Sequence, residues 1–264
     1  LIVYFSLLVS MGVYFSRRER STNDFFKAGG RIPWWAAGIS IFGTQLSAVT
    51  FMAIPAKTYA TNWRYFTYNM SIVMVAPLIV LLFLPFFRRL NITTAYEYLE
   101  LRFNAAARLI SSLMFIAFQL SRIGIVMFLP SIALSVVTGI NVYVCILVMG
   151  ALSITYTVLG GIEAVIWTDV LQVIVLFGGV IISLGVVLFS LGGSVTDSIA
   201  TAVSQGKLHT FDFSLDITAP SLWVVVVGGI AANIVSYGSD QTVIQRYLTT
   251  RDEQSAARSV WTNA

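Results

Sequence analysis

Charge, histidine and cysteine are all scarce in this sequence. Only 11% of its 264 residues are charged, whereas soluble domains carry roughly a quarter. Its one cysteine, Cys145, cannot form an internal disulfide, and its one histidine, His209, cannot form a metal site by itself. No apolar segment holds a nucleophile beside a base or a cluster of metal ligands, so we expect neither a metalloenzyme nor another enzyme.

Apolar residues dominate the chain instead. Hydrophobic residues make up 57% of it and the mean hydropathy is +0.84, which indicates a polytopic membrane protein whose surroundings are a lipid bilayer. The formal net charge is +4, but the basic residues sit in short loops between apolar segments, where positive charge reports topology. We therefore expect no nucleic-acid partner.

Seven apolar segments are long enough, or nearly so, to cross a membrane as helices. They are residues 1–16, 34–60, 66–87, 108–138, 142–159, 163–192 and 220–245. The ten-residue alternation of a membrane barrel is missing, so the predicted fold is all-α. Lys and Arg concentrate in residues 17–31, 88–108 and 246–258, which predicts that these loops are cytoplasmic and that the chain starts outside. The predicted location is the cell inner membrane, crossed several times.

Two connecting segments are predicted to contain helices. Residues 92–103 open with a Thr cap and carry apolar residues at helical spacing, so they form a helix along the inner membrane surface or a short connector helix. Residues 191–222 contain Gly192, Gly193 and many polar residues, which predicts an external loop with one short helix around residues 195–204.

The segment 32–63 carries Gly, Thr, Gln and Ser at its centre, residues 43–50, where a lipid-facing helix would carry Leu and Ile. A helix can be interrupted within a membrane only where its freed carbonyls face protein or an ion, and such interruptions mark the binding sites of transporters. The alternative is a continuous helix whose small residues let a neighbour pack closely. Backbone hydrogen bonds distinguish the two, because only a break frees carbonyls between about Ser40 and Ser47.

Arg122 lies deep within the apolar segment 108–138. An ionised side chain at mid-membrane costs at least roughly 2.5–3.5 kcal/mol, so such a residue is a functional-site hypothesis by default. Its planar guanidinium suits a carboxylate held by two parallel hydrogen bonds. That carboxylate belongs either to an internal aspartate or to a substrate.

Three further polar residues lie within the apolar segments. Asp169 follows a tight turn predicted at Gly160 and Gly161, near the inner face, where a carboxylate can bind a small cation or pair with an arginine. Asp240 lies in the inner half of the last segment, and Asn69 lies just inside the outer end of the third. Together they extend the set of candidate donors and acceptors.

Three stretches of the chain resemble the sodium/solute symporter family, namely residues 45–51, 160–172 and 240–247. Within that family the chain looks most like the bacterial sodium-coupled sialic acid transporters. The marks of this branch are residues 13–17, 34–38, 51–57, 94–100 and Arg122. The resemblance covers nearly the whole chain.

The resemblance implies a transporter fold of two inverted five-helix repeats, with sodium bound between the broken first helix and the eighth core helix. On this pattern residues 1–16 are an extra leading helix, about 33–192 the first repeat and about 219–246 the first helix of the second repeat. The eighth core helix would lie beyond residue 264. We therefore expect a fragment that needs the missing C-terminal helices of the same polypeptide and does not transport alone.

The resemblance also implies roles for individual residues. Those expected to line the substrate site are Ser47, Thr50, Asn69 and Arg122, the last holding the substrate carboxylate. The backbone carbonyls of Gly43 and Leu46 would bind the main sodium ion, and Asp169 would serve a second sodium site.

Two positions depart from the family pattern. The position of Asn69 is a Gln in the sialic acid branch and a Glu in the galactose branch, so one substrate contact is shorter here. Asp240 stands where relatives have Asn or Ser, and it adds a negative charge near the expected anion site. We include Asp240 among the expected substrate contacts.

These expectations favour a sodium-driven symporter that imports a small carboxylated sugar, with sialic acid as the favoured substrate and sodium ions as co-transported partners. One alternative is a symporter for a neutral sugar or another monocarboxylate, in which Arg122 pairs internally. Another is a non-transporting membrane sensor with a transporter-like domain, which a signalling domain after residue 264 would distinguish.

Overall fold

The computed structural model describes residues 2–17, 21–90, 92, 94–190 and 194–264. Regular structure in these ranges is helical, apart from an isolated parallel bridge between Ile32 and Thr250, so the all-α prediction is confirmed. Leu1, Arg18, Arg20, Thr93, Gly192 and Gly193, which belong to predicted segments, lie outside the described residues.

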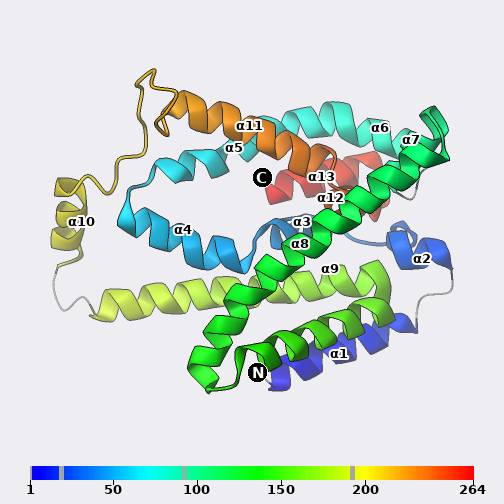
Figure 1. Cartoon of the computed structure of the whole chain (residues 1–264), viewed down its shortest axis with the longest axis horizontal. Coiled ribbons are helices and arrows are strands. Elements are labelled where there is room, and N and C mark those ends of the chain that lie inside the picture. Colours follow the sequence, from blue (N-terminus) through cyan, green and yellow to red (C-terminus); the bar gives the residue numbers. More distant parts are fainter. Residues whose placement is uncertain (1, 18–20, 91, 93, 191–193) are drawn as a thin grey trace.

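The described helices follow the predicted segments closely (Figure 1). Their bounds are α1 Ile2–Ser16, α2 Thr22–Lys27, η1 Ala28–Gly30, α3 Trp34–Gln45, α4 Ala48–Ala60, α5 Arg64–Leu78, η2 Ile79–Phe83, α6 Leu84–Arg89, α7 Ala95–Arg102, α8 Ala105–Thr138, α9 Val142–Ser190, α10 Val195–Ser204, α11 Leu222–Gly238, α12 Gln241–Leu248 and α13 Glu253–Asn263. The helix predicted within residues 92–103 is α7, and the helix predicted around residues 195–204 is α10.

Three stretches are long and apolar enough to cross a membrane without a sharp bend, namely Arg64–Arg89, Ala105–Thr138 and Val142–Ser190. Two bent pairs, α3 with α4 and α11 with α12, qualify when each is taken as one span. The break in the second pair, where the axis bends by 56°, was not predicted. Side chains of α8 and α9 are mostly exposed in this chain, as lipid-facing helices or helices awaiting partners would be.

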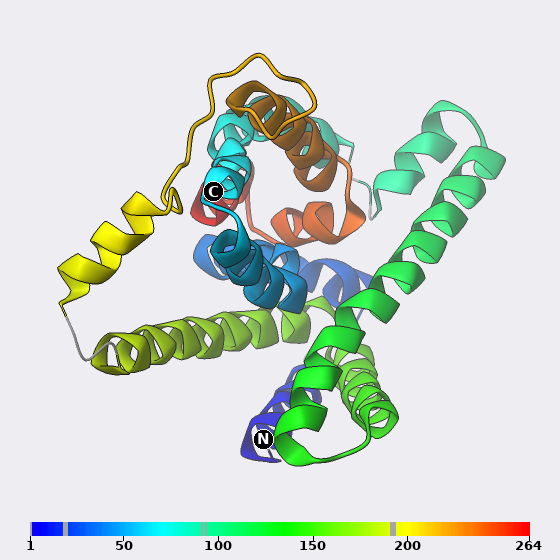
Figure 2. The ribbon, with the colours of Figure 1, turned by 60° about the vertical axis from the view of Figure 1, so that its left-hand side comes forward.

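The helix α9 is two helices joined by a reversal at Gly161. This glycine has φ 52° and ψ −156°, a conformation essentially restricted to glycine, so the turn predicted at Gly160 and Gly161 is confirmed. A Cβ at Gly12 would lie 2.9 Å from the Tyr156 backbone, so α1 packs directly against the first half of α9. Figures 1 and 2 show this pair beside each other at the N-terminal edge of the molecule.

The largest buried core lies around the inner half of the first broken pair. Helix α3 contacts α9, α12 and α13, and its Ile41 is buried with Ile79, Val243 and Tyr247. Figure 1 places α2, α6 and α7 toward one end of the molecule and α10, with the turn between α4 and α5, toward the other. The end with α2, α6 and α7 carries the arginine-rich connections that the sequence predicts to be cytoplasmic, so α3 points from that end toward the middle.

Candidate functional site

The centre of the candidate site is the break between α3 and α4. The two helices are inclined by 58°, and Leu46 and Ser47 between them are extended, with ψ 107° and 165°. The Leu46 N–H still donates to the Phe42 carbonyl at 2.9 Å, but the Thr50 N–H donates to the Ser47 hydroxyl at 3.2 Å. The helical ladder is therefore interrupted, and the predicted break is confirmed over the continuous-helix alternative.

Small and capping residues explain why the chain breaks here. Ser47 caps α4, because its Oγ accepts the Thr50 N–H and lies 3.2 Å from the Thr50 hydroxyl. A Cβ at Gly43 would lie 3.0 Å from the Val173 side chain, so glycine lets the end of α3 approach α9. The last carbonyls of α3 lack the N–H groups of a following helical turn as hydrogen-bond donors, as at any helix C-terminus.

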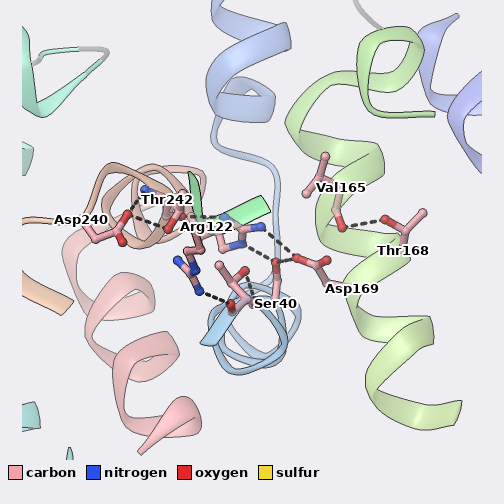
Figure 3. Close-up of polar contacts among 9 residues, drawn as sticks. Ser40, Arg122, Val165, Thr168, Asp169, Asp240 and Thr242 are labelled. Carbon is pink, nitrogen blue, oxygen red and sulfur yellow. Dashed lines mark hydrogen bonds and ion pairs between the residues drawn. The ribbon is translucent and has the colours of Figure 1, made fainter. Parts of the chain in front are cut away.

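Arg122 reaches this break from α8. Its Nη2 donates to the Thr44 carbonyl, in the last turn of α3, at a long distance of 3.4 Å (Figure 3). The predicted partner was a carboxylate, whereas the partner in this structure is a backbone oxygen of the broken helix. The guanidinium is therefore held at the break by one weak hydrogen bond.

Asp169 lies on the other side of α3, in a compact polar cluster shown in Figure 3. Its Oδ2 accepts a hydrogen bond of 2.6 Å from the Ser40 hydroxyl. The same oxygen forms an ion pair with Arg246, whose Nη2 lies 3.0 Å away. Arg246 Nε also donates to Ser40 Oγ at 2.8 Å. Of the two partners considered for Asp169, a cation and an arginine, the structure shows the arginine; its role toward sodium stays a prediction.

A cavity of about 360 Å³ opens beside the break. Polar or aromatic residues on its wall are Phe42, Gln45, Thr50, Tyr65, Tyr68, Asn69, Asn233, Ser236, Tyr237 and Asn263. Leu46 of the break also lines it, and Gln45 Nε2 is buried without a hydrogen-bond partner among the described residues. A site with unpaired neutral donors suits a polar, uncharged portion of a ligand such as hydroxyl groups.

The cavity joins only some of the predicted substrate residues. Thr50 and Asn69 line its wall, whereas Ser47, Arg122 and Asp240 do not. Asp240 caps α12, since its Oδ1 accepts the Thr242 N–H at 2.8 Å and the Thr242 hydroxyl at 2.7 Å. Its predicted contact with substrate stays a prediction.

Sequence reasoning missed several cavity residues. Asn233 lies within the apolar helix α11, and its amide donates to the Ser71 hydroxyl at 2.8 Å and to the Gly229 carbonyl at 2.9 Å. The argument applied to Arg122, a polar group inside an apolar segment, would have found it. Gln45 belonged to the predicted break but had no assigned role. Asn263 lies in α13, which is outside the seven predicted apolar segments, so the search for polar residues within those segments did not include it.

A second, outer cavity of about 680 Å³ lies between α4, α5 and α10, and it shares Ile54 and Asn69 with the inner one. Lys207 beside it donates to the Tyr59 carbonyl at 2.7 Å, which fastens the external loop to the end of α4. In the same loop, hydrogen bonds from Ser214, with help from Arg64, hold the pKa of the Asp212 carboxyl below its usual range. The loop predicted to be external is thus fixed over the adjoining ends of α4 and α5.

Comparison with known proteins places the chain in a family. Residues 25–263 match the Sodium:solute symporter family, and the chain belongs to it. It is 39% identical over 262 residues to the sodium/sialic acid symporter SiaT of Proteus mirabilis, covering 99% of this chain and 53% of that protein. It is 38% identical to the sodium/sialic acid symporter NanT of Aliivibrio fischeri, covering 100% of this chain and 52% of that protein.

A solved structure agrees with this assignment. The substrate-bound outward-open state of a Na⁺-coupled sialic acid symporter matches 99% of this chain and 56% of its own, with a TM-score of 0.93 and 38% identity. The predicted family and transporter fold are confirmed, and the chain spans about half the length of the curated relatives it matches. These relatives are named as transporters, and the described residues contain no group of three His, Cys, Asp or Glu side chains that could hold a metal.

Proposed function

We propose that this chain is part of a sodium-driven symporter of the bacterial inner membrane that imports a small carboxylated sugar, sialic acid, by alternating access. The observation that carries the proposal is the break between α3 and α4, which puts helix-end carbonyls beside a cavity of neutral polar groups, while Arg122, outside the cavity wall, donates to one of those carbonyls. The names of the two bacterial relatives support the substrate.

In this proposal the break supplies two kinds of ligand. The carbonyls of Gly43 and Leu46 bind one sodium ion, because helix-end carbonyls are hard oxygen donors with partial negative charge. Arg122 exchanges its weak hydrogen bond to the Thr44 carbonyl for two charge-assisted hydrogen bonds to the sugar carboxylate. Thr50 and Asn69 bind the sugar hydroxyls from the cavity wall.

The proposal assigns residues about 33–192 to the first inverted repeat and about 219–246 to the start of the second. The remaining C-terminal helices would complete the sodium site and the substrate cavity. Sodium at the break favours the state open to the outside, which then binds the sugar, and the difference in affinity between the outward and inward states couples the two gradients.

Uptake of labelled sialic acid tests the proposal directly. The full-length protein is produced in cells lacking their own sialic acid transporter, and uptake is measured with sodium and with sodium replaced by potassium. We expect uptake that requires sodium. A neutral sugar transported equally well by the unmodified protein and by Arg122→Ala would contradict the carboxylated substrate, and uptake indifferent to sodium would contradict the symport mechanism.

A further inference from the structure

Arg246 already occupies the Asp169 carboxylate, which would bind a second sodium ion on the family resemblance behind the proposed function. Its guanidinium lies 3.0 Å from Asp169 Oδ2, and its Nε and Nη1 donate to the Ser40 hydroxyl and to the Thr242 carbonyl at 2.8 and 2.6 Å. The side chains of Arg246 and Asp169 are only 9% and 16% exposed. This is a nearly buried ion pair with several further hydrogen bonds.

The ion pair ties together three helices that are far apart in sequence. Ser40 belongs to α3, the inner half of the broken helix, Asp169 belongs to the second half of α9, and Arg246 lies in the last turn of α12. Nearby contacts close the same end of the molecule, since the Ile32 N–H donates to the Thr249 carbonyl at 3.3 Å and Gln245 Nε2 donates to the Phe26 carbonyl at 3.0 Å. A path to the cytoplasm beside α3 therefore requires this ion pair to separate.

The balance of charge makes the two cations alternatives. Asp169 carries one negative charge, which either Arg246 or a sodium ion neutralises. If both cations contacted the carboxylate at once, an unneutralised positive charge would remain buried, and such a charge is costly. Arg246 stands at the end of α12 on the side predicted to be cytoplasmic, so its long side chain can extend its charge toward water when it leaves Asp169.

We propose that Arg246 is an internal cation that competes with sodium for Asp169 and keeps the cytoplasmic end of α3 closed until sodium replaces it. The inference rests on the proposed function, because it assumes a sodium ion at Asp169. It adds a residue from the proposed second repeat to that site and gives sodium a second task. Sodium at Asp169 removes the contact that holds α3 to α12, and so it favours the state open to the inside.

The first test is the sodium dependence of uptake by the full-length protein. Arg246→Gln removes the competing charge while keeping a polar side chain, and we expect the half-saturating sodium concentration to fall roughly five- to tenfold. Arg246→Lys keeps the competing charge but loses the fork of hydrogen bonds to Ser40 and Thr242, so its half-saturating sodium concentration should lie between those of Arg246→Gln and the unmodified protein. Arg251→Gln is the matched control, since this exposed arginine lies close by in sequence and should leave the curve unchanged.

The second test reads the conformation without transport. Ser259 is fully buried, and its carbonyl faces Gly38 across the contact between α13 and α3. In purified full-length protein that carries Cys145→Ser, the variant Ser259→Cys should react slowly with a soluble thiol reagent in potassium, because Arg246 then holds Asp169. With no sodium at the break, adding Arg246→Gln should make the reaction faster, whereas adding Arg251→Gln should not.

The outcomes separate this inference from the function on which it rests. Sodium-dependent uptake that is identical in the unmodified protein and in a folded Arg246→Gln variant overturns the competition. If Arg246→Gln does not fold, Asp169→Asn is compared with the double variant Asp169→Asn/Arg246→Gln. Equal sodium curves for these two support the inference, and a further shift of the curve in the double variant overturns it. Unmodified protein that transports without any need for sodium refutes the proposed function instead.

Discussion

The two halves of the broken helix differ in how firmly they are held. In α3, Ala36, Ala37, Ser40 and Ile41 are completely buried against α9, α12 and α13. In α4 every described side chain is exposed or half-buried. Since regions with few buried contacts open most easily, α3 acts as a fixed base and α4 as the half that can move about the break. The substrate cavity lies at the junction between them, so its shape depends on the angle that α4 adopts.

The sharpest test of this comparison adds one methyl group within the buried base of α3 and another at its end, beside the break. A Cβ at Gly38, within the fixed base, would lie 2.7 Å from the Ser259 carbonyl oxygen and 2.6 Å from Thr262 Cβ. We expect Gly38→Ala to destabilise the purified protein by about 1–3 kcal/mol because the backbone of α13 must shift. Thermal unfolding in detergent measures this as a drop of several degrees in Tm.

Gly43→Ala is the control, since the same change at the end of α3 is tight only against Val173 Cγ2, at 3.0 Å, and makes ordinary contacts of 3.6 and 3.7 Å with Asp169. The Val173 side chain can turn away, and alanine favours helix over glycine, so we expect Tm to stay unchanged or rise slightly. Equal losses of stability in the two variants would mean that the end of α3 is as tightly packed as its base.

The next largest effect should come from Arg122, at the break itself. Arg122→Lys keeps the charge but loses the two-pronged geometry, and a hydrogen bond to a charged group contributes about 1.5–3 kcal/mol. We expect sialic acid affinity to fall roughly 10- to 100-fold while sodium binding by the purified protein is retained. Sodium-stimulated uptake at near-normal affinity in this variant would show that Arg122 has a structural role only.

The third effect concerns the carboxylate of Asp169, which contacts α3 through Ser40 and is the expected ligand of a second sodium ion. In Asp169→Asn an amide oxygen can still accept from Ser40 and Arg246, so the protein should fold and insert, but the charge that attracts sodium is lost. We expect a roughly tenfold higher half-saturating sodium concentration, equivalent to about 1.4 kcal/mol, with a lower Hill coefficient for uptake. An unchanged sodium curve would reduce Asp169 to one half of a structural ion pair.

The smallest effect should come from Asp240, which lies outside both halves. Asn caps a helix about as well as Asp, so Asp240→Asn should change stability by no more than a few tenths of a kcal/mol and leave uptake near normal. A marked gain in affinity for sialic acid would instead show that this charge repels the substrate, as its expected place near the anion site implied.

Much of this architecture could be read from local sequence. The break needed only Gly43, Ser47 and Thr50 in an otherwise apolar segment, and the reversal in α9 needed only the pair at Gly160 and Gly161. Both signals are local because they depend on backbone freedom and capping over a few residues. For the same reason the second break could have been found, since Asp240 is a typical helix N-cap.

Long-range partners could not be predicted in this way. Arg246 served the sequence argument only as a marker of the cytoplasmic side, yet it is the partner of Asp169, 77 residues away. The sequence suggested a carboxylate as the partner of Arg122, but the partner in the structure is the Thr44 carbonyl. Every residue has a backbone carbonyl, so residue type gives no signal for such a contact. Periodicity and hydropathy state which face of a helix is polar, but they do not state which distant helix comes to lie against it.

The contact between Gln245 and the Phe26 carbonyl joins residues 219 apart in sequence, and it bears on how the protein is made. A ribosome adds roughly 5–20 residues per second, so roughly 10–40 seconds separate the synthesis of these two partners. Early in that interval α3 is completed, but α12 and Arg246 are made only at its end. The cytoplasmic end of the site is therefore assembled after all the helices of the first repeat, and it is the stage at which a slowed or prematurely ended synthesis would leave Asp169 without its arginine.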